Sequence, residues 1–153
     1  MSVCAKRWEL ELNADLNTLW EFISNPMNLA KITPSQMSFK VLSEGLPSEI
    51  YPGLMIHYSL KPFPGYSTQW LTEITHVVKG SYFVDEQRHG PYKLWHHEHF
   101  IEEQNGKVLM RDILHYSLPF GMIGQLLNSA FISAKIEGIF EHRRKAMLQL
   151  FPE

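Results

Sequence analysis

The sequence lacks most of the features that mark specialised classes of protein. Cys4 is the only cysteine among 153 residues, so no disulfide can form within the chain and a reducing cytoplasm is the expected location. No apolar run approaches the roughly 20 residues of a membrane-spanning helix, and the N-terminus has no apolar core of the signal-peptide kind. The net charge is -2 without a basic block, which argues against a nucleic-acid partner. The sequence therefore predicts one cytoplasmic domain over residues 1–153.

What the sequence does contain is regular periodicity. Alternation of apolar and polar residues predicts seven strands, over residues 6–13, 37–44, 54–60, 68–77, 81–87, 94–103 and 107–117. Helical spacing predicts short helices over 13–24 and 25–34, capped by Asn13 and Asn25, and one long helix between Phe120 and Phe151. The apolar stripe predicted for the long helix consists of Ile123, Leu127, Phe131 or Ala130, Ala134, Ile136, Ile139 or Phe140, Met147 and Leu150. This order predicts an α+β domain in which a seven-stranded antiparallel sheet wraps on the long C-terminal helix, with two short helices after the first strand.

The turn between the last two strands fixes their register. Asn105-Gly106 between alternating runs is the strongest short signal for a hairpin with a two-residue type I′ turn. Counting outward from that turn sets His99 opposite Asp112. An inward imidazole and an inward carboxylate both need partners, so we expect these two side chains to hydrogen-bond to each other. His97 has no obvious partner on the opposite strand. Its candidate partners are Tyr116, Gln87, a water or a ligand.

The same alternation divides the histidines of "LWHHEHF", residues 94–100, between the two faces of the sheet. His97 and His99 share a face with Trp95 and Tyr116, and this more apolar face is expected to lie against the long helix. His96 belongs to the opposite, more charged face and is expected to point into solvent. The three histidines are therefore not one cluster.

The strand over residues 81–87 adds polar groups whose direction the sequence leaves open. Phe83, Asp85 and Gln87 share one face. If Phe83 is inward, Asp85 and Gln87 join the two inward histidines. In the preceding strand, Trp70 belongs to the set that we favour as inward.

Four interpretations of the inward polar residues remain open. His97, His99 and Asp112 resemble a two-histidine, one-carboxylate metal site, but no cysteine supports it and no fourth ligand is readable, so we predict no metal and no cofactor. They are also candidate catalytic acids or bases, although no activated nucleophile or glycine-rich phosphate loop accompanies them. A third interpretation is a buried network that only stabilises the sheet. We favour the fourth, a polar end in an apolar pocket that orients a bound molecule.

Several segments together resemble a known family. "LWEFISNPMNLAKITP", "FVDEQRHGPYKLWHHEHF", "MRDILHYSLPFG" and "IFEHRRK" look like the bacterial ligand-binding branch of the START / birch-pollen-allergen (SRPBCC) superfamily, which is related to polyketide cyclase/dehydrase-like proteins. The resemblance implies a helix-grip fold with a cavity for hydrophobic molecules. The loop "SEGLPSEIYPG" departs from the glycine-rich loop of the pollen allergens, which argues against a plant-hormone type of ligand.

The resulting hypothesis is a protein that binds a small hydrophobic molecule such as a lipid, an isoprenoid or an aromatic polyketide. Its predicted ligand-binding residues are Trp70, Asp85, Gln87, Trp95, His97, His99, Asp112, Tyr116 and Phe131. The alternative is a cyclase- or dehydrase-type enzyme in which His97, His99 or Asp112 moves protons. A third class, a regulatory module that binds a protein partner, predicts a filled core rather than an open pocket. The sequence indicates no oligomeric state.

Overall fold

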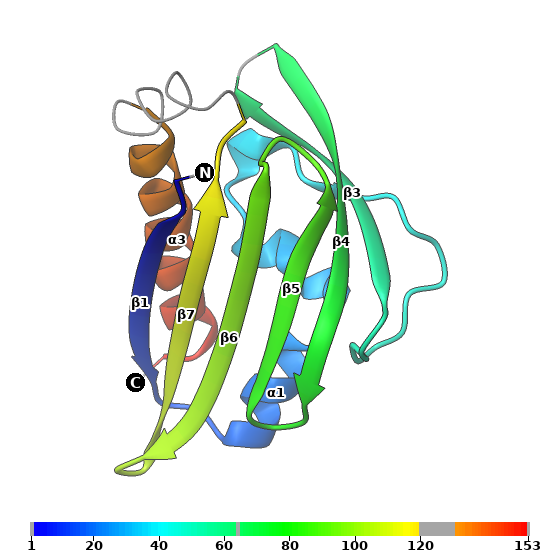
Figure 1. Ribbon diagram of the computed structural model, residues 1–153. Helices are drawn as coiled ribbons and strands as arrows, with labels where there is room; N and C mark the ends of the chain where they lie inside the picture. Colours follow the sequence, from blue (N-terminus) through cyan, green and yellow to red (C-terminus); the bar gives the residue numbers. More distant parts are fainter. Residues whose placement is uncertain (1, 64, 120–130, 153) are drawn as a thin grey trace.

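The computed structural model describes residues 2–63, 65–119 and 131–152 (Figure 1). Its regular elements are β1 (Cys4–Leu12), α1 (Leu16–Ile23), the 3-10 helices η1 (Pro26–Ile32) and η2 (Ser35–Met37), β2 (Lys40–Val41), β3 (Met55–Phe63), β4 (Tyr66–Val78), β5 (Tyr82–His89), β6 (Leu94–Gln104), β7 (Lys107–Ser117) and α3 (Ser133–Leu150).

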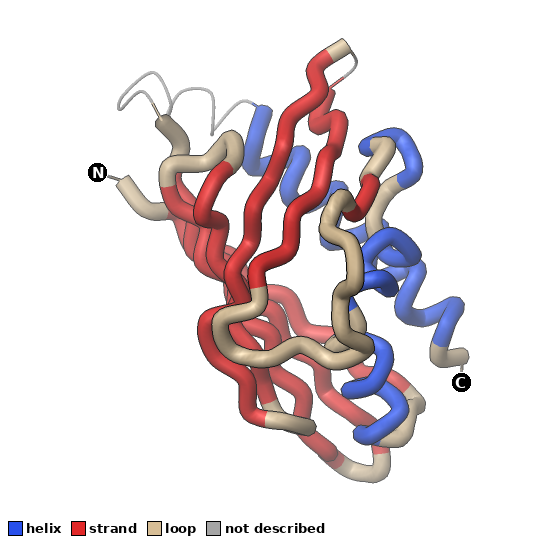
Figure 2. The backbone as a smooth tube through the Cα atoms, turned by 90° about the vertical axis from the view of Figure 1, so that its right-hand side faces the viewer, coloured by secondary structure: helices blue, strands red, loops and turns tan. Residues whose placement is uncertain are grey.

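The strands form one antiparallel sheet in the order β1-β7-β6-β5-β4-β3-β2. The sheet is bent, and α1, η1 and α3 all lie on the same side of it (Figure 2). Each strand pairs with its neighbour in sequence except β1, which pairs with β7 and so places the N-terminal strand beside the last one. The predicted α+β class, with a seven-stranded sheet and a C-terminal helix, is confirmed.

The two short helices form where we predicted them, with one change of cap. Asp15, not Asn13, is the N-cap of α1, because its carboxylate accepts a hydrogen bond from the Thr18 backbone N–H at 2.9 Å. Asn25 caps η1 as predicted, and Pro26 occupies the first turn, where a missing N–H has no cost. The second helix is a 3-10 helix rather than an α-helix.

Two strand boundaries differ from the sequence prediction. The strand predicted over residues 37–44 is reduced to Lys40–Val41, because the chain before it forms η2 and turns at Ser38, whose φ is +46°. The segment predicted as a connection between β3 and β4 instead extends both strands into a long hairpin. A register shift between Leu60 and Phe63 accommodates Pro62, which has no N–H to donate to the sheet.

The C-terminal helix closes the concave side of the sheet. Within its described part, Ile136, Phe140 and Met147 are buried, as the predicted apolar stripe requires, whereas Ala134 and Leu150 are exposed. The predicted stripe also included Ile123 and Leu127, which lie outside the described residues. No described helix has the length and apolar character needed to cross a membrane.

The edge strand β1 attaches directly to this helix. The rings of Trp8 and Phe140 stack with centroids 3.6 Å apart and planes within 2°. The Trp8 indole N–H donates to Glu137 at 2.8 Å, and Lys6 forms an ion pair with the same carboxylate. These contacts hold one margin of the bent sheet against the helix.

Candidate functional site

A cavity of about 520 Å³ lies between the sheet and the helices. Residues of η1, β3, β4, β5, β6 and α3 contribute to its walls. Most of the lining side chains are apolar or aromatic, and they include Leu29, Ile32, Phe39, Ile56, Leu60, Trp70, Ile74, Phe83, Tyr92, Trp95, Met110, Phe131 and Ile139. The space is therefore suited to an apolar molecule.

Three aromatic rings pack together in one part of this wall. The ring centroids of Trp70 and Trp95 are 5.1 Å apart at an edge-to-face angle of 88°, and Tyr92 lies 4.7 Å from Trp95. The side chain of Gln87 holds the backbone of Tyr92 in place, donating to its carbonyl at 2.6 Å and accepting from its N–H at 3.2 Å. The wall is therefore braced by contacts among its own residues.

Four polar side chains gather on β5, β6 and β7, of which three are buried and Asp85 is half-buried. Asp112 Oδ1 lies 3.1 Å from His97 Nε2 and 2.9 Å from His99 Nδ1. On the other side of the two imidazoles, Asp85 Oδ2 lies 2.7 Å from His99 Nε2 and 3.5 Å from His97 Nδ1. Each imidazole is thus placed between two carboxylates, and we call these four residues the inner cluster.

Strand register builds the inner cluster. Asn105 and Gly106 both have positive φ, at +54° and +79°, as a type I′ turn requires. The turn sets His99 opposite Asp112, so the predicted pairing is confirmed. The next pairing sets Asp85 opposite His97 and settles the direction that the sequence left open. His97 therefore finds its partners in Asp112 and Asp85, two groups that sequence reasoning had not assigned to it.

The carboxylates and imidazoles shift one another's proton affinity. Burial alone would raise the pKa of Asp112 and of Asp85, but hydrogen bonds and charge from His97 and His99 outweigh it and lower both pKa values. The two histidines differ: burial lowers the pKa of His97, helped by the charge of His99. Burial also opposes ionisation of His99, yet the bonds to Asp112 and Asp85 raise its pKa. The surroundings therefore favour the protonated form more in His99 than in His97.

Arg143 brings a guanidinium group to the inner cluster from α3. Its Nη1 lies 4.0 Å from Asp112 Oδ1, and its guanidinium lies over the Phe140 ring at 4.8 Å. Its Nε is buried without a hydrogen-bond partner among the described residues. Sequence reasoning left its direction open, although Arg143 follows Phe140 by three residues and precedes Met147 by four, on the buried stripe.

The predicted ligand-binding residues fall into two groups. Trp70, Asp85, Trp95, His97, His99 and Phe131 line the cavity; Gln87, Asp112 and Tyr116 are not among the lining residues. The Gln87 amide is engaged with Tyr92, Asp112 lies behind the two imidazoles, and Tyr116 is 1% exposed and packs in the core with Phe140. Direct contact of Gln87, Asp112 and Tyr116 with a ligand remains a prediction, and their positions outside the lining do not support it.

Sequence reasoning missed most of the wall that β3 and η1 contribute. Ile56, Tyr58 and Leu60 alternate along β3 and face the cavity, and Leu29 and Ile32 approach it from η1. The alternation in β3 was a usable signal. The contribution of η1 depends on how that helix lies across the sheet, which no local pattern indicates.

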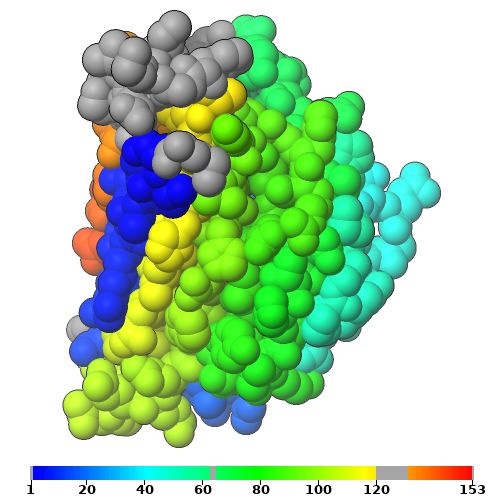
Figure 3. Space-filling model, viewed as in Figure 1, coloured from blue at the N-terminus to red at the C-terminus, as the bar shows by residue number. Residues whose placement is uncertain are grey.

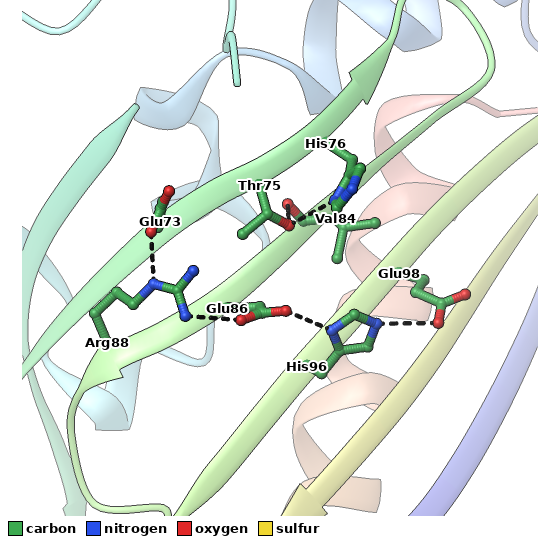
Figure 4. A network of polar contacts seen from close by, with 8 residues as sticks. All are labelled: Glu73, Thr75, His76, Val84, Glu86, Arg88, His96 and Glu98. Carbon is green, nitrogen blue, oxygen red and sulfur yellow. Dashed lines mark hydrogen bonds and ion pairs between the residues drawn. The ribbon is translucent and has the colours of Figure 1, made fainter. Parts of the chain in front are cut away.

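The outer face of the same strands carries a different set of charges. Side chains of β4 to β7 cover this face continuously (Figure 3). His96 lies between Glu86 and Glu98, at 2.9 and 3.1 Å, and Arg88 bonds to Glu86 and to Glu73 (Figure 4). The prediction that His96 points away from His97 and His99 is confirmed.

This architecture, a bent seven-stranded sheet closed on a C-terminal helix around a cavity, is the helix-grip fold that the sequence resemblance implied. No protein-family model matches the sequence, and no curated protein matches it significantly.

Solved structures with the same fold come from bacteria and plants. CV1439 from Chromobacterium violaceum is 12% identical with a TM-score of 0.73, over 98% of this chain and 99% of that one. TTHA0849 from Thermus thermophilus is 13% identical with a TM-score of 0.69, over 96% and 99%. Major latex-like protein 151 from Panax ginseng is 11% identical with a TM-score of 0.71, over 99% of each chain. At these identities the likeness concerns the fold.

Proposed function

We propose that residues 1–153 form one cytoplasmic domain that binds a small hydrophobic molecule with a polar end. The observation that carries this proposal is the cavity of about 520 Å³ with a largely apolar lining and the inner cluster at its wall. Pockets for small molecules commonly measure about 300–1,000 Å³ and combine apolar walls with a few polar groups. A partner-binding module with a filled core fits such a space poorly.

The arrangement of the lining supports an amphipathic ligand. Trp70 and Trp95 offer broad apolar surface, while His97, His99 and Asp85 provide hydrogen-bonding groups at the same cavity. Burying apolar ligand surface is worth about 25 cal/mol per Å², so the body of the ligand supplies affinity and the inner cluster orients its polar end. Lipids, isoprenoids and aromatic polyketides share this combination.

Native mass spectrometry of the freshly purified protein tests the proposal directly. We expect a co-purified small molecule, or uptake of one equivalent of 1-anilinonaphthalene-8-sulfonate when the cavity is empty. Ile139→Trp enlarges a half-buried side chain that lines the cavity and should abolish binding of either molecule. Val78→Trp adds the same ring at an exposed site on β4 and should leave binding intact. Equal binding by both variants would contradict a ligand in the cavity.

That the protein is an enzyme remains an alternative prediction. One variant distinguishes an enzyme from a carrier. His99→Ala removes an imidazole that lines the cavity and contacts Asp85 and Asp112. In a carrier it should weaken retention of the ligand, whereas in a cyclase- or dehydrase-type enzyme it should abolish turnover of that ligand.

A further inference from the structure

We propose that Asp85, His97 and His99 form a binding site for one divalent transition-metal ion at the polar wall of the cavity. Among the described residues these three offer ligand atoms that all lie within 4.8 Å of one another, and all three line the cavity. The proposal departs from the sequence prediction of no metal, and it does not depend on the identity of any hydrophobic ligand.

The spacing of the donor atoms fits a metal ion. Metal bonds of about 2.1 Å set neighbouring ligand atoms roughly 3.0–3.4 Å apart in octahedral or tetrahedral geometry. Asp85 Oδ2 lies 2.7 Å from His99 Nε2 and 3.5 Å from His97 Nδ1, so these two separations bracket that range. All three ligand atoms lie within 4.8 Å of one another, and rotation of the imidazoles would adjust their spacing to an ion.

Asp112 completes the arrangement from behind the imidazoles. Its Oδ1 lies 3.1 Å from His97 Nε2 and 2.9 Å from His99 Nδ1, the two ring nitrogens that face away from Asp85. Histidines that bind metals usually donate their other ring N–H to a carboxylate, which fixes the tautomer and the ring orientation. When both rings donate to Asp112, their other nitrogens are turned toward Asp85, and a bound ion would take the place of the proton between His99 Nε2 and Asp85 Oδ2.

The donor set indicates which metals fit and what completes the site. Two imidazoles and one carboxylate favour Fe²⁺, Co²⁺ or Zn²⁺ over Mg²⁺ and Ca²⁺, which prefer oxygen ligands. Three protein ligands leave coordination positions for water or for an oxygen of a molecule in the cavity. Arg143 lies 4.0 Å from Asp112, so the site with its ion would carry excess positive charge and would favour an anionic oxygen, such as a carboxylate or enolate.

Titration of protein stripped with a chelator tests the site with the metal alone. We expect one equivalent of Co²⁺ to bind with visible ligand-field absorption, and one equivalent of Zn²⁺ to bind by calorimetry. Asp85→Asn keeps the shape of the side chain but removes its charge, and His99→Gln removes an imidazole; each should lower affinity at least about 100-fold. Asp112→Asn acts through the histidines and should lower it about 10- to 100-fold. Circular dichroism checks that each variant is folded.

His96→Gln is the matched control, because His96 is the neighbouring residue on the outer face and contacts two glutamates there. This variant should bind Co²⁺ as the wild type does. The proposal is overturned if wild type and Asp85→Asn bind equally, or if His96→Gln abolishes binding, which would indicate surface binding only. X-ray absorption of the zinc-loaded wild type should show two imidazole nitrogens; none or one would also overturn it.

Failure of this site is distinguishable from failure of the proposed ligand binding. Ile139→Trp fills the cavity from α3 without altering a metal ligand. It should therefore lose the hydrophobic molecule and keep one equivalent of Co²⁺. A wild type that binds the hydrophobic molecule but no Co²⁺ would overturn the metal site alone.

Discussion

Two adjacent residues of β6, His96 and His97, each lie between two carboxylates, but on opposite faces of the sheet. His96 lies between Glu86 and Glu98 on the outer face, and its side chain is 31% exposed. His97 lies between two aspartates on the inner face, and its side chain is 4% exposed. Each imidazole lies within 3.5 Å of two carboxylates, so the largest difference between the two sites is burial.

Burial changes what these contacts are worth. Exposed ion pairs contribute about 0–1 kcal/mol, because water screens the charges and the side chains lose freedom when they pair. Inside the protein the same contacts are strong, but removing one partner leaves an unpaired group in a poor solvent, at a cost of about 3–5 kcal/mol. The inner cluster is therefore hard to alter piecemeal, whereas the outer network tolerates change. This difference makes the inner cluster the region where function is expected.

The largest effect should follow loss of Asp112. Asp112→Ala leaves His97 and His99 without their shared acceptor, and we expect the free energy of unfolding to fall by about 3–5 kcal/mol. Urea denaturation of the metal-free protein measures it. Glu98→Ala removes one partner of His96 on the outer face and serves as the control. Similar losses for the two variants would show that burial does not distinguish the faces.

The second prediction concerns the dependence of stability on pH. Hydrogen bonds from His97 and His99 overcome burial and hold the pKa of Asp112 below its value in the unfolded chain, about 3.9. A depressed pKa contributes stability that is present above about pH 4 and is lost as pH falls toward the folded-state pKa. The urea concentration at the midpoint of unfolding of the metal-free protein should therefore decrease as the pH is lowered below 4. The decrease should be less steep in Asp112→Asn. Glu98→Gln should follow the wild type.

Two threonines of β4 allow a smaller version of the same comparison. Thr72 is 2% exposed and accepts the hydroxyl hydrogen of Tyr58 at 2.6 Å, whereas Thr75 is part of the outer face. Thr72→Val leaves the Tyr58 hydroxyl without its acceptor and should cost about 1–2 kcal/mol in unfolding experiments. Thr75→Val should change stability by less than about 0.5 kcal/mol. Equal effects would contradict a difference in burial between the two faces of β4.

Local rules predicted the face to which each histidine belongs. Alternation separated His96 from His97, and the Asn105-Gly106 turn aimed His99 at Asp112, because a two-residue type I′ hairpin has a single register. The strands and the closing helix were predicted from the periodicity of apolar residues. All of these features are determined by residues close together in the sequence or by a single turn.

Features set by packing between distant elements were not predictable in this way. Asp85 joins the inner cluster only because β5 pairs with β6 in one register, and no turn signal specified that register. Arg143 reaches Asp112 from α3, 31 positions further along the chain, through the way the helix crosses the sheet. The cavity likewise exists only when β3, η1 and α3 are assembled.

The smallest expected effect concerns the outer network and its response to salt. His96→Gln removes a ring from a partly exposed site between Glu86 and Glu98, and should change the free energy of unfolding by less than about 0.5 kcal/mol. Raising NaCl from 0.1 to 1 M shortens the screening length from about 10 to about 3 Å, so even this difference should shrink. The cost of Asp112→Ala should persist at high salt, because screening acts weakly on buried charges and the lost hydrogen bonds do not depend on it. If salt instead reduced both differences alike, the inner cluster would have to be accessible to solvent ions, and burial would not distinguish it from the outer face.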